Sequence, residues 1–298
     1  MTIFDNAPRS ASATCITEVE ALKVDIELLK NNSEYFLIYL KLCQLFGTKI
    51  AKRLRYLNDV TVESFKEKLV VGTFAINIIA MTSLYAVALQ VLQKLKSFFS
   101  NSTLVTIFVL LGFCYFIFNM MMKSGYPLAT FGLTLKNWKK SLFESILFTL
   151  PILGIIVLIK FYVITFNPEF SKISLFDPGA IFQGKHAFNL KTYLLALNGY
   201  IIFVPLQELI VRGGIQTALQ KFLTGSQTKI RVGSIILSNV IFAGGHSHIS
   251  SGFAISVFLP GIFWGWLFSR QKSLLGVSIS HILIGVWAAF VVGFENIF

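Results

Sequence analysis

Residues 201–223, IIFVPLQELIVRGGIQTALQKFL, decide the fold because they place ionisable side chains inside an otherwise apolar helix. Glu208 and Arg212 stand four residues apart, so on a helix their side chains lie one turn apart and can form an ion pair. An ionisable residue at bilayer depth costs about 2.5–3.5 kcal/mol on insertion scales and therefore needs such a partner. Two interpretations remain open: a functional polar site within the membrane, or an ion pair at a helix end from which Arg212 reaches the surface.

The composition is that of an integral membrane protein. Of the 298 residues, 55% are hydrophobic and 13% are charged, and the mean hydropathy is +0.71. Several windows exceed the roughly 18 apolar residues that a helix needs to cross a bilayer. The formal net charge of +12 lies in short runs between the apolar segments. This pattern is typical of cytoplasmic loops beside anionic headgroups, so we expect the lipid bilayer, and not nucleic acid, as a partner.

Residues 1–68 differ in composition from the rest of the chain. Segments 10–17 and 19–25 are predicted to form two short strands, and apolar residues at helical spacing predict a helix over 26–58. A piece of this length is too short to bury a core of its own. We therefore expect a short α/β segment on the cytoplasmic side that precedes the membrane helices.

From residue 69 onward, long apolar segments follow one another closely, and we predict about seven transmembrane helices. The predicted spans are 69–92, 104–122, 142–165, 192–220, 232–250, 253–269 and 273–294. The first two are accessory helices within residues 69–122, and the other five form a core domain over 123–298. Lysine and arginine alternate between the loops, which predicts a cytoplasmic N-terminus and an outside C-terminus. The expected fold is an all-α bundle that crosses the inner or plasma membrane several times.

Two further segments carry polar residues at a similar depth. SNVIFAGGHSHIS places His246 one turn after Phe242, and SISHILIG places His281 inside the last span. At ~1.5 Å per residue, Glu208 and His281 both lie ~12–20 Å from the cytoplasmic side, with His246 somewhat deeper. These residues are expected to meet in one polar pocket. A neutral histidine beside a carboxylate suits general acid–base chemistry, whereas a single buried histidine more often bonds a backbone carbonyl.

Pairs of glycines predict close contacts between helices. The segment FLPGIFWGWLF carries Gly261 and Gly265 four residues apart, which gives one helix face without side chains and lets a neighbouring helix approach. Gly213 and Gly214 follow Arg212 directly and are likewise expected to admit a neighbouring backbone.

A zinc site is the alternative interpretation of the same residues. Glu208, His246 and His281 have the composition of a three-ligand site that leaves one position open. His246 and His248 stand two residues apart, so on a helix they point in different directions and cannot both bind one ion. No HExxH motif is present in the sequence. We therefore expect a site that works without a cofactor.

The motifs QELIVRGGI, FAGGH and SHILIG occur in this order, with GxxxGW and SLLG between the last two. They resemble the CPBP family of intramembrane proteases, which includes CAAX prenyl endopeptidases and bacteriocin-processing or abortive-infection proteins. The resemblance extends over about residues 123–294, and the pattern of the family is EExxxR, FxxxH and then HxxxN or HxxxD. It implies an intramembrane endopeptidase whose substrate is a membrane-associated peptide or protein, prenylated in the CAAX branch.

The first motif differs from the family pattern at one position. Gln207 stands where the family has its first glutamate, Glu208 takes the place of the second, and Arg212 that of the arginine. In the family, the first glutamate and the histidines activate the water that attacks the peptide bond. An amide cannot accept a proton near neutral pH, so Gln207 can orient water but cannot deprotonate it. The Glu208–Arg212 pair is expected to be structural, with Glu208 as a weak substitute base.

The histidine motifs assign the remaining site residues. His246 corresponds to the histidine of FxxxH and His281 to that of the last motif, where Gly285 replaces the usual asparagine or aspartate. The resemblance implies that both histidines orient water and stabilise the oxyanion. The first alternative is a catalytically inactive homologue that acts as a membrane scaffold or immunity protein. A transporter or channel ranks lowest, because a single acidic residue in the cluster leaves little for an ion relay.

Residues 7–58 resemble the C-terminal part of a cyclic nucleotide-binding domain. The similarity runs from the Pro8, Arg9, Ser10 and Ala11 of a phosphate-binding cassette through the closing helix. In that family the cassette arginine, here Arg9, pairs with the cyclic phosphate. Nearly all of the family's barrel lies upstream of this segment, so we expect no cyclic nucleotide to bind to this chain.

Overall fold

The computed structural model is built from helices and contains no strand among the residues that it describes. Those residues are 12, 14–21, 24–94, 102–182, 188–247 and 250–297. The chain forms two compact units, Met1–Glu67 and Lys68–Phe298. The all-helical class predicted for the membrane part is confirmed.

The strands predicted at 10–17 and 19–25 do not form in the described part of those segments, where the backbone has bends and irregular structure. Two short strands with no further strand beside them are marginal in water, which gives the physical reason for the difference. The prediction of an α/β segment is therefore corrected for the described residues. Arg9 and its cassette neighbours lie outside the described residues.

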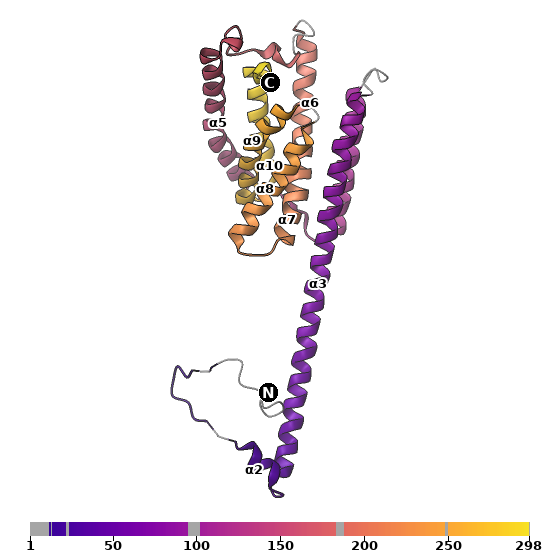
Figure 1. Cartoon of the computed structure of the whole chain (residues 1–298), viewed down its shortest axis with the longest axis vertical. Helices are drawn as coiled ribbons and strands as arrows, with labels where there is room; N and C mark the ends of the chain where they lie inside the picture. The colour runs from indigo at the N-terminus through magenta and orange to yellow at the C-terminus, as the bar shows by residue number, and fades with distance from the viewer. Residues whose placement is uncertain are drawn as a thin grey trace. The chain divides into compact units, whose positions relative to one another are not determined.

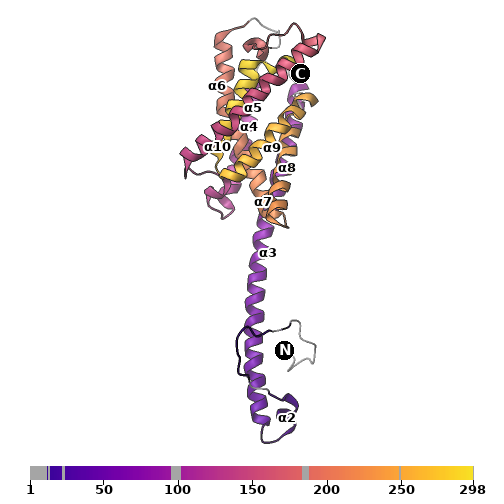
Figure 2. The same ribbon diagram turned by 90° about the vertical axis from the view of Figure 1, so that its left-hand side faces the viewer.

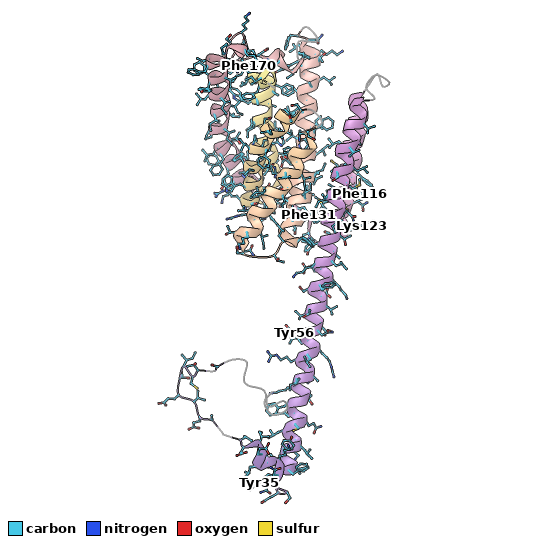
Figure 3. The ribbon with its side chains drawn as sticks, in the orientation of Figure 1. Tyr35, Tyr56, Phe116, Lys123, Phe131 and Phe170 are labelled. Carbon is cyan, nitrogen blue, oxygen red and sulfur yellow. The ribbon has the colours of Figure 1, made fainter. Side chains whose placement is uncertain are left out.

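The described part of the first unit is helical from residue 26 onward apart from one turn, and none of its described residues is fully buried, as the short length of the unit predicts. Helix α2 (Ile26–Asn31) begins after Asp25, whose carboxylate accepts the backbone N–H groups of the first turn. A turn then separates α2 from α3 (Phe36–Lys94), so the helix predicted over 26–58 is interrupted once. Tyr56 projects from α3 with 68% of its surface exposed (Figure 3). Helix α3 continues past the end of this unit into the second.

The second unit contains the end of α3 and the remaining helices. These helices are α4 (Ser102–Lys123), α5 (Trp138–Phe166), α6 (Leu190–Glu208), α7 (Thr217–Phe222), α8 (Gln227–Gly245), α9 (Ser251–Gln271) and α10 (Leu274–Gly285). Wider π-helical turns follow α6 and α10, at η5 (Leu209–Gln216) and η6 (Val286–Val292). Short 3-10 turns occupy the loops at η2 (Leu128–Phe131), η3 (Pro168–Phe170), η4 (Pro178–Phe182) and η7 (Phe294–Ile297).

Among the described residues, four helical stretches are long and apolar enough to cross a membrane. They are Trp138–Phe166, Leu190–Phe222, Ser251–Gln271 and Leu274–Val292, and a shorter apolar helix covers Leu110–Lys123. Helix also covers the described residues of the predicted spans 69–92 and 104–122 and most of 232–250. The α8 sequence carries Lys229, Arg231 and two serines, which lower its hydropathy. A total of about seven spans therefore stays a prediction.

Helix α10 occupies the centre of the second unit. It contacts α5, α6 and α9, and α8 packs against α9 and η5 (Figures 1 and 2). Leu267 and Phe268 of α9 and Val277 of α10 are fully buried in this core. A side chain on α10 can therefore meet residues from α6, α8 and α9 at once, which is where the polar residues of the sequence motifs converge.

The loop between α4 and α5 also folds onto this bundle. Phe131 of η2, labelled in Figure 3, is 2% exposed, and its ring centroid lies 6.0 Å from that of Phe74 on α3. Its carbonyl oxygen lies 3.0 Å from the place where a Cβ on Gly213 would stand, so this glycine admits a neighbouring backbone as predicted. The backbone N–H of Leu274 donates to the carbonyl of Gly132, which ties the start of α10 to the same loop.

Lys160 binds the C-terminal end of the last long helix, which comprises α10 and η6. The sequence motifs did not indicate this residue. It lies on α5 and is fully buried. Its ammonium donates to the carbonyl oxygens of Val292 and Gly293, at the end of η6. These carbonyls have no partner within their own helix, and a cation there is favourable for the helix dipole as well.

Candidate active site

Glu208 is the centre of the polar site and lies where α6 passes into the wider turns of η5. Its carboxylate is 1% exposed, with Oε2 at 3.3 Å from Nε of Arg212. The ion pair predicted from the spacing is therefore present and buried. Its other oxygen, Oε1, lies 2.6 Å from Nδ1 of His281 on α10. The predicted meeting of Glu208 and His281 is thus confirmed, and one carboxylate connects both cationic partners.

The bond to Glu208 determines which nitrogen of His281 can act as a base. A carboxylate held by Arg212 accepts hydrogen bonds, so Nδ1 of His281 carries the proton that it donates. In the neutral imidazole, Nε2 then holds the lone pair. A carboxylate behind a histidine fixes the tautomer and favours the protonated ring once a proton has been taken up.

Arg212 is fully buried, and each nitrogen of its guanidinium has a partner. Besides Nε on Glu208, Nη2 donates to the carbonyl of Gly261 at 2.8 Å and Nη1 to Oε1 of Gln216 at 3.4 Å. A buried charge that is both paired and hydrogen-bonded avoids the cost of an isolated one. The helix-end interpretation, in which Arg212 reaches the surface, is therefore wrong for this structure.

The glycine pair of α9, Gly261 and Gly265, leaves the space that Arg212 needs for these contacts. A Cβ on Gly261 would overlap the side chain of Asn239 on α8, and one on Gly265 would lie 3.1 Å from Nη1 of Arg212. The tight helix contact predicted from GxxxG is therefore confirmed. It also leaves the carbonyl oxygens of both glycines free to accept from side chains of η5, because Gln216 donates to Gly265 at 2.9 Å.

Aromatic rings hold His281 in place. The ring of Trp264 stacks on it at a centroid distance of 3.7 Å, while Phe242 meets it edge-on at 6.0 Å. The indole Nε1–H of Trp264 is buried and has no hydrogen-bond partner among the described residues. A buried donor left without a partner costs about 1–3 kcal/mol, so a polar group of a ligand or a water is expected to meet it.

His246 also contacts the ring of Phe242. Its ring centroid is 4.6 Å from that of Phe242, and its Nδ1 lies 2.8 Å from the carbonyl oxygen of that residue. Since a carbonyl can only accept, Nδ1 donates and Nε2 is the basic nitrogen. The prediction placed His246 inside a span, but α8 ends at Gly245 and His246 is the residue that follows it. His248 lies outside the described residues.

Gln207 is half-buried beside Glu208, and its side chain makes no hydrogen bond to any described residue. Consecutive helical residues point about 100° apart, so the side chain of Gln207 leaves α6 in a different direction from that of Glu208. The described residues contain no group of three or more histidine, cysteine, aspartate or glutamate side chains arranged to hold a metal ion. That part of the chain therefore provides no set of ligands for the alternative zinc site.

Tyr200 is a site residue that the motifs did not indicate. A Cβ on Gly285 would overlap its hydroxyl and the adjacent ring carbons, so Tyr200 occupies the space of any side chain at position 285. Its ring centroid lies 6.3 Å from that of His281. Two sequence features could have indicated it: the glycine at the family's asparagine position, and the spacing of seven that puts Tyr200 and Gln207 on one stripe of α6.

Fold and site define an integral membrane protein with a buried Glu–Arg–His cluster between apolar helices. Residues 189–287, about a third of the chain, match the family model described as Type II CAAX prenyl endopeptidase Rce1-like. The match confirms the resemblance of the motifs to the CPBP/CAAX protease family, a family of intramembrane endopeptidases. It contains all of Gln207, Glu208, Arg212, His246 and His281. Comparison with curated proteins and with solved structures gives no match.

Proposed function

We propose that the protein is an intramembrane endopeptidase of the CAAX type, in which His281 takes the proton of the attacking water. The observation that carries the proposal is the 2.6 Å bond between Oε1 of Glu208 and Nδ1 of His281, held in place by Arg212. This bond leaves the lone pair of His281 on Nε2, which can therefore act as the base. The amide of Gln207 cannot take up a proton. The substrate is a peptide segment that enters from the bilayer, with prenylated C-terminal peptides as the first class to test.

In the proposed reaction, His281 carries the proton from the attacking water to the leaving amine. Nε2 removes a proton from water while the water oxygen attacks the carbonyl carbon of the scissile bond, and Glu208 stabilises the resulting imidazolium. When the tetrahedral intermediate collapses, the imidazolium gives that proton to the leaving amine. His246, whose Nε2 is also the basic nitrogen, orients the water. Gln207 contributes an amide that can hydrogen-bond the substrate or the water but moves no proton.

Position 285 has no side chain that could bind the oxyanion, and we propose that two other hydrogen-bond donors bind it instead. One is the hydroxyl of Tyr200, which fills that position, and the other is the unpartnered Nε1–H of Trp264, stacked on His281. Fixed donors aimed at a developing oxyanion are among the largest contributions to catalysis, at roughly 10²–10³-fold in rate for a single donor. Both residues belong to the walls of the His281 site, on α6 and α9.

The alternative function is that of a catalytically inactive homologue that binds a membrane partner without cutting it. Two departures from the family pattern favour it. Gln207 lacks a titratable group, and Gly285 lacks a side chain. A protein of this kind would keep the Glu208–Arg212–His281 cluster for stability. The two functions differ in one respect that can be measured, which is turnover.

The proposed function is tested with the full chain in liposomes and a membrane-anchored fluorogenic peptide, offered with and without a C-terminal prenyl group. Cleavage by the wild type is expected, with a loss of at least about 10²-fold for His281→Ala and for Glu208→Gln. Glu144→Gln is the matched control, because Glu144 also pairs with an arginine, Arg270, but at the exposed surface. Its rate should equal that of the wild type. Equal rates for wild type and His281→Ala would refute the proposal.

A further inference from the structure

A basic pocket lies at one end of the bundle, away from the His281 site. Its volume is about 630 Å³, and it lies between η2, α7, the start of α8 and the end of α9. Three cations line it: Lys221 from α7, Arg231 from α8 and Lys272 from the connection between α9 and α10. Hydroxyl and amide groups fill the rest of its polar wall, including Thr217, Gln220 and Ser269. No carboxylate belongs to this lining.

Two of these cations, Arg231 and Lys272, are not neutralised by a described carboxylate. Arg231 and Lys272 form no ion pair with any described residue, and Nζ of Lys272 donates to Oε1 of Gln220 at 2.7 Å. Nζ of Lys221 lies 3.5 Å from the ring centroid of Tyr126, a cation–π contact. Partial burial and the nearby charge of Lys221 lower the pKa of Lys272. The pocket therefore concentrates positive charge that an anion would relieve.

The backbone around the pocket supports the same chemistry. Lys272 has φ +51°, a left-handed conformation that glycine usually supplies at the end of a helix. A lysine kept there at a conformational cost points to a use for its side chain. Gln227 and Thr228, the first two residues of the 19-residue helix α8, also line the pocket, and the N–H groups of a helix start attract anions.

We propose that this pocket binds a phosphate group, presented either by an anionic lipid headgroup or by free phosphate. The planar fork of Arg231 suits two phosphate oxygens, and Lys221 and Lys272 add point charges on either side. The hydroxyl and amide side chains of the wall donate the remaining hydrogen bonds to the phosphate oxygens. The lysine and arginine pattern assigns these loops to the cytoplasmic face, where anionic headgroups attract basic residues.

A continuous row of hydrogen bonds links the pocket to the buried cluster. Lys272 donates to Gln220, and Gln220 and Gln216 both donate to Oγ of Ser269, at 3.2 and 2.9 Å. Gln216 in turn accepts from Arg212, which holds Glu208. An anion that orders Lys272 therefore also restrains this row. The bound protein is expected to unfold at a higher temperature, whether or not it is an enzyme.

The test measures the melting temperature of the full chain in nanodiscs of neutral phosphatidylcholine. One arm adds inorganic phosphate, with sodium chloride of equal ionic strength as its control, and the other replaces part of the lipid with phosphatidylglycerol. A ligand that binds the folded state raises the melting temperature in proportion to ln(1 + [L]/Kd). We expect a rise in at least one arm. A rise with phosphate indicates free phosphate as a sufficient ligand, and a rise with the lipid alone indicates the headgroup.

Variants then place the effect in the pocket. Arg231→Gln and Lys272→Gln should lose most of the rise, and their combination should abolish it. Lys136→Gln, an exposed lysine outside the pocket lining, is the matched control and should keep it. Arg231 is exposed, so its replacement leaves the folded state intact. No rise in either arm, or a full rise in the Arg231→Gln, Lys272→Gln double variant, would overturn the proposal. Cleavage plays no part in this readout, so its outcome is independent of the proposed protease.

Discussion

The hydroxyl of Tyr200 occupies the space that a side chain on Gly285 would need, although the two residues lie on different helices. In the CPBP pattern that position carries asparagine or aspartate, one turn after the last histidine. Here a residue of α6 reaches across to α10 and places a hydroxyl at the same point. The two positions are therefore coupled: a larger residue at 285 requires a smaller one at 200.

Substitutions at both positions test this coupling. Gly285→Asn alone should lower the melting temperature, because overpacking a buried site costs about 1–3 kcal/mol. Adding Tyr200→Ala should recover part of the loss by freeing the space. Thermal unfolding in detergent measures both effects, and Gly154→Asn, on α5 with open space around it, is the matched control. An unchanged melting temperature for Gly285→Asn would show that Tyr200 does not fill this position.

The buried ion pair predicts a strong effect of Arg212 on stability. Removing one partner leaves an uncompensated charge among apolar helices and is expected to cost about 3–5 kcal/mol. Arg212→Ala should therefore reduce both folded yield and melting temperature, and Glu208→Gln on the same background should restore part of each. Arg270→Ala removes a surface pair and should cost about 0–1 kcal/mol. Equal stability of Arg212→Ala and Arg270→Ala would contradict a buried pair.

Lys160 is expected to hold the end of the last helix. Lys160→Met keeps the length of the side chain but leaves the carbonyls of Val292 and Gly293 without their donor, at a cost of about 1–3 kcal/mol. Hydrogen exchange should then accelerate in the last turns of η6. Lys191→Met, at an exposed position on α6, serves as the control. Unaltered exchange at the end of η6 would mean that Lys160 does not cap it.

The predicted topology has a direct test. The alternation of lysine and arginine predicts that Lys229 faces the cytoplasm and Lys172 the opposite side. Single cysteines at these positions, in a variant whose Cys15, Cys43 and Cys114 are serine, should be labelled from opposite sides by a membrane-impermeant maleimide. Labelling of both from the same side would contradict this orientation.

The sequence predicts those features of the site that follow from spacing along one helix. The ion pair of Glu208 and Arg212 follows from a separation of four, and the close approach at Gly261 and Gly265 follows from small residues on one face. Apolar segment lengths likewise predict an all-helical membrane bundle. Each of these relations is local, so helical periodicity is sufficient to find it.

Relations between distant helices could not be predicted in this way. How the helices pack determines the contact of Tyr200 with Gly285 and the bonds of Lys160 to the end of η6. It also determines that the indole N–H of Trp264 meets no acceptor among the described residues. The strands predicted near the N-terminus are absent from the described residues of 10–25 for a related reason, because strand formation depends on a neighbouring strand and not on alternation alone. The basic pocket likewise gathers cations from three separate segments.

The most direct test of the proposed mechanism replaces Gln207 by glutamate and measures single-turnover cleavage of a membrane peptide in liposomes. We predict slow cleavage by the wild type and a rise of about 10²–10⁴-fold for Gln207→Glu, because this variant restores a titratable carboxylate at the position of the family's first glutamate. Adding His281→Ala or His246→Ala should remove the gain, since base and histidines act as one unit. No cleavage by either the wild type or a folded Gln207→Glu variant, on a peptide that another member of the family cuts, would contradict the protease and favour the inactive scaffold.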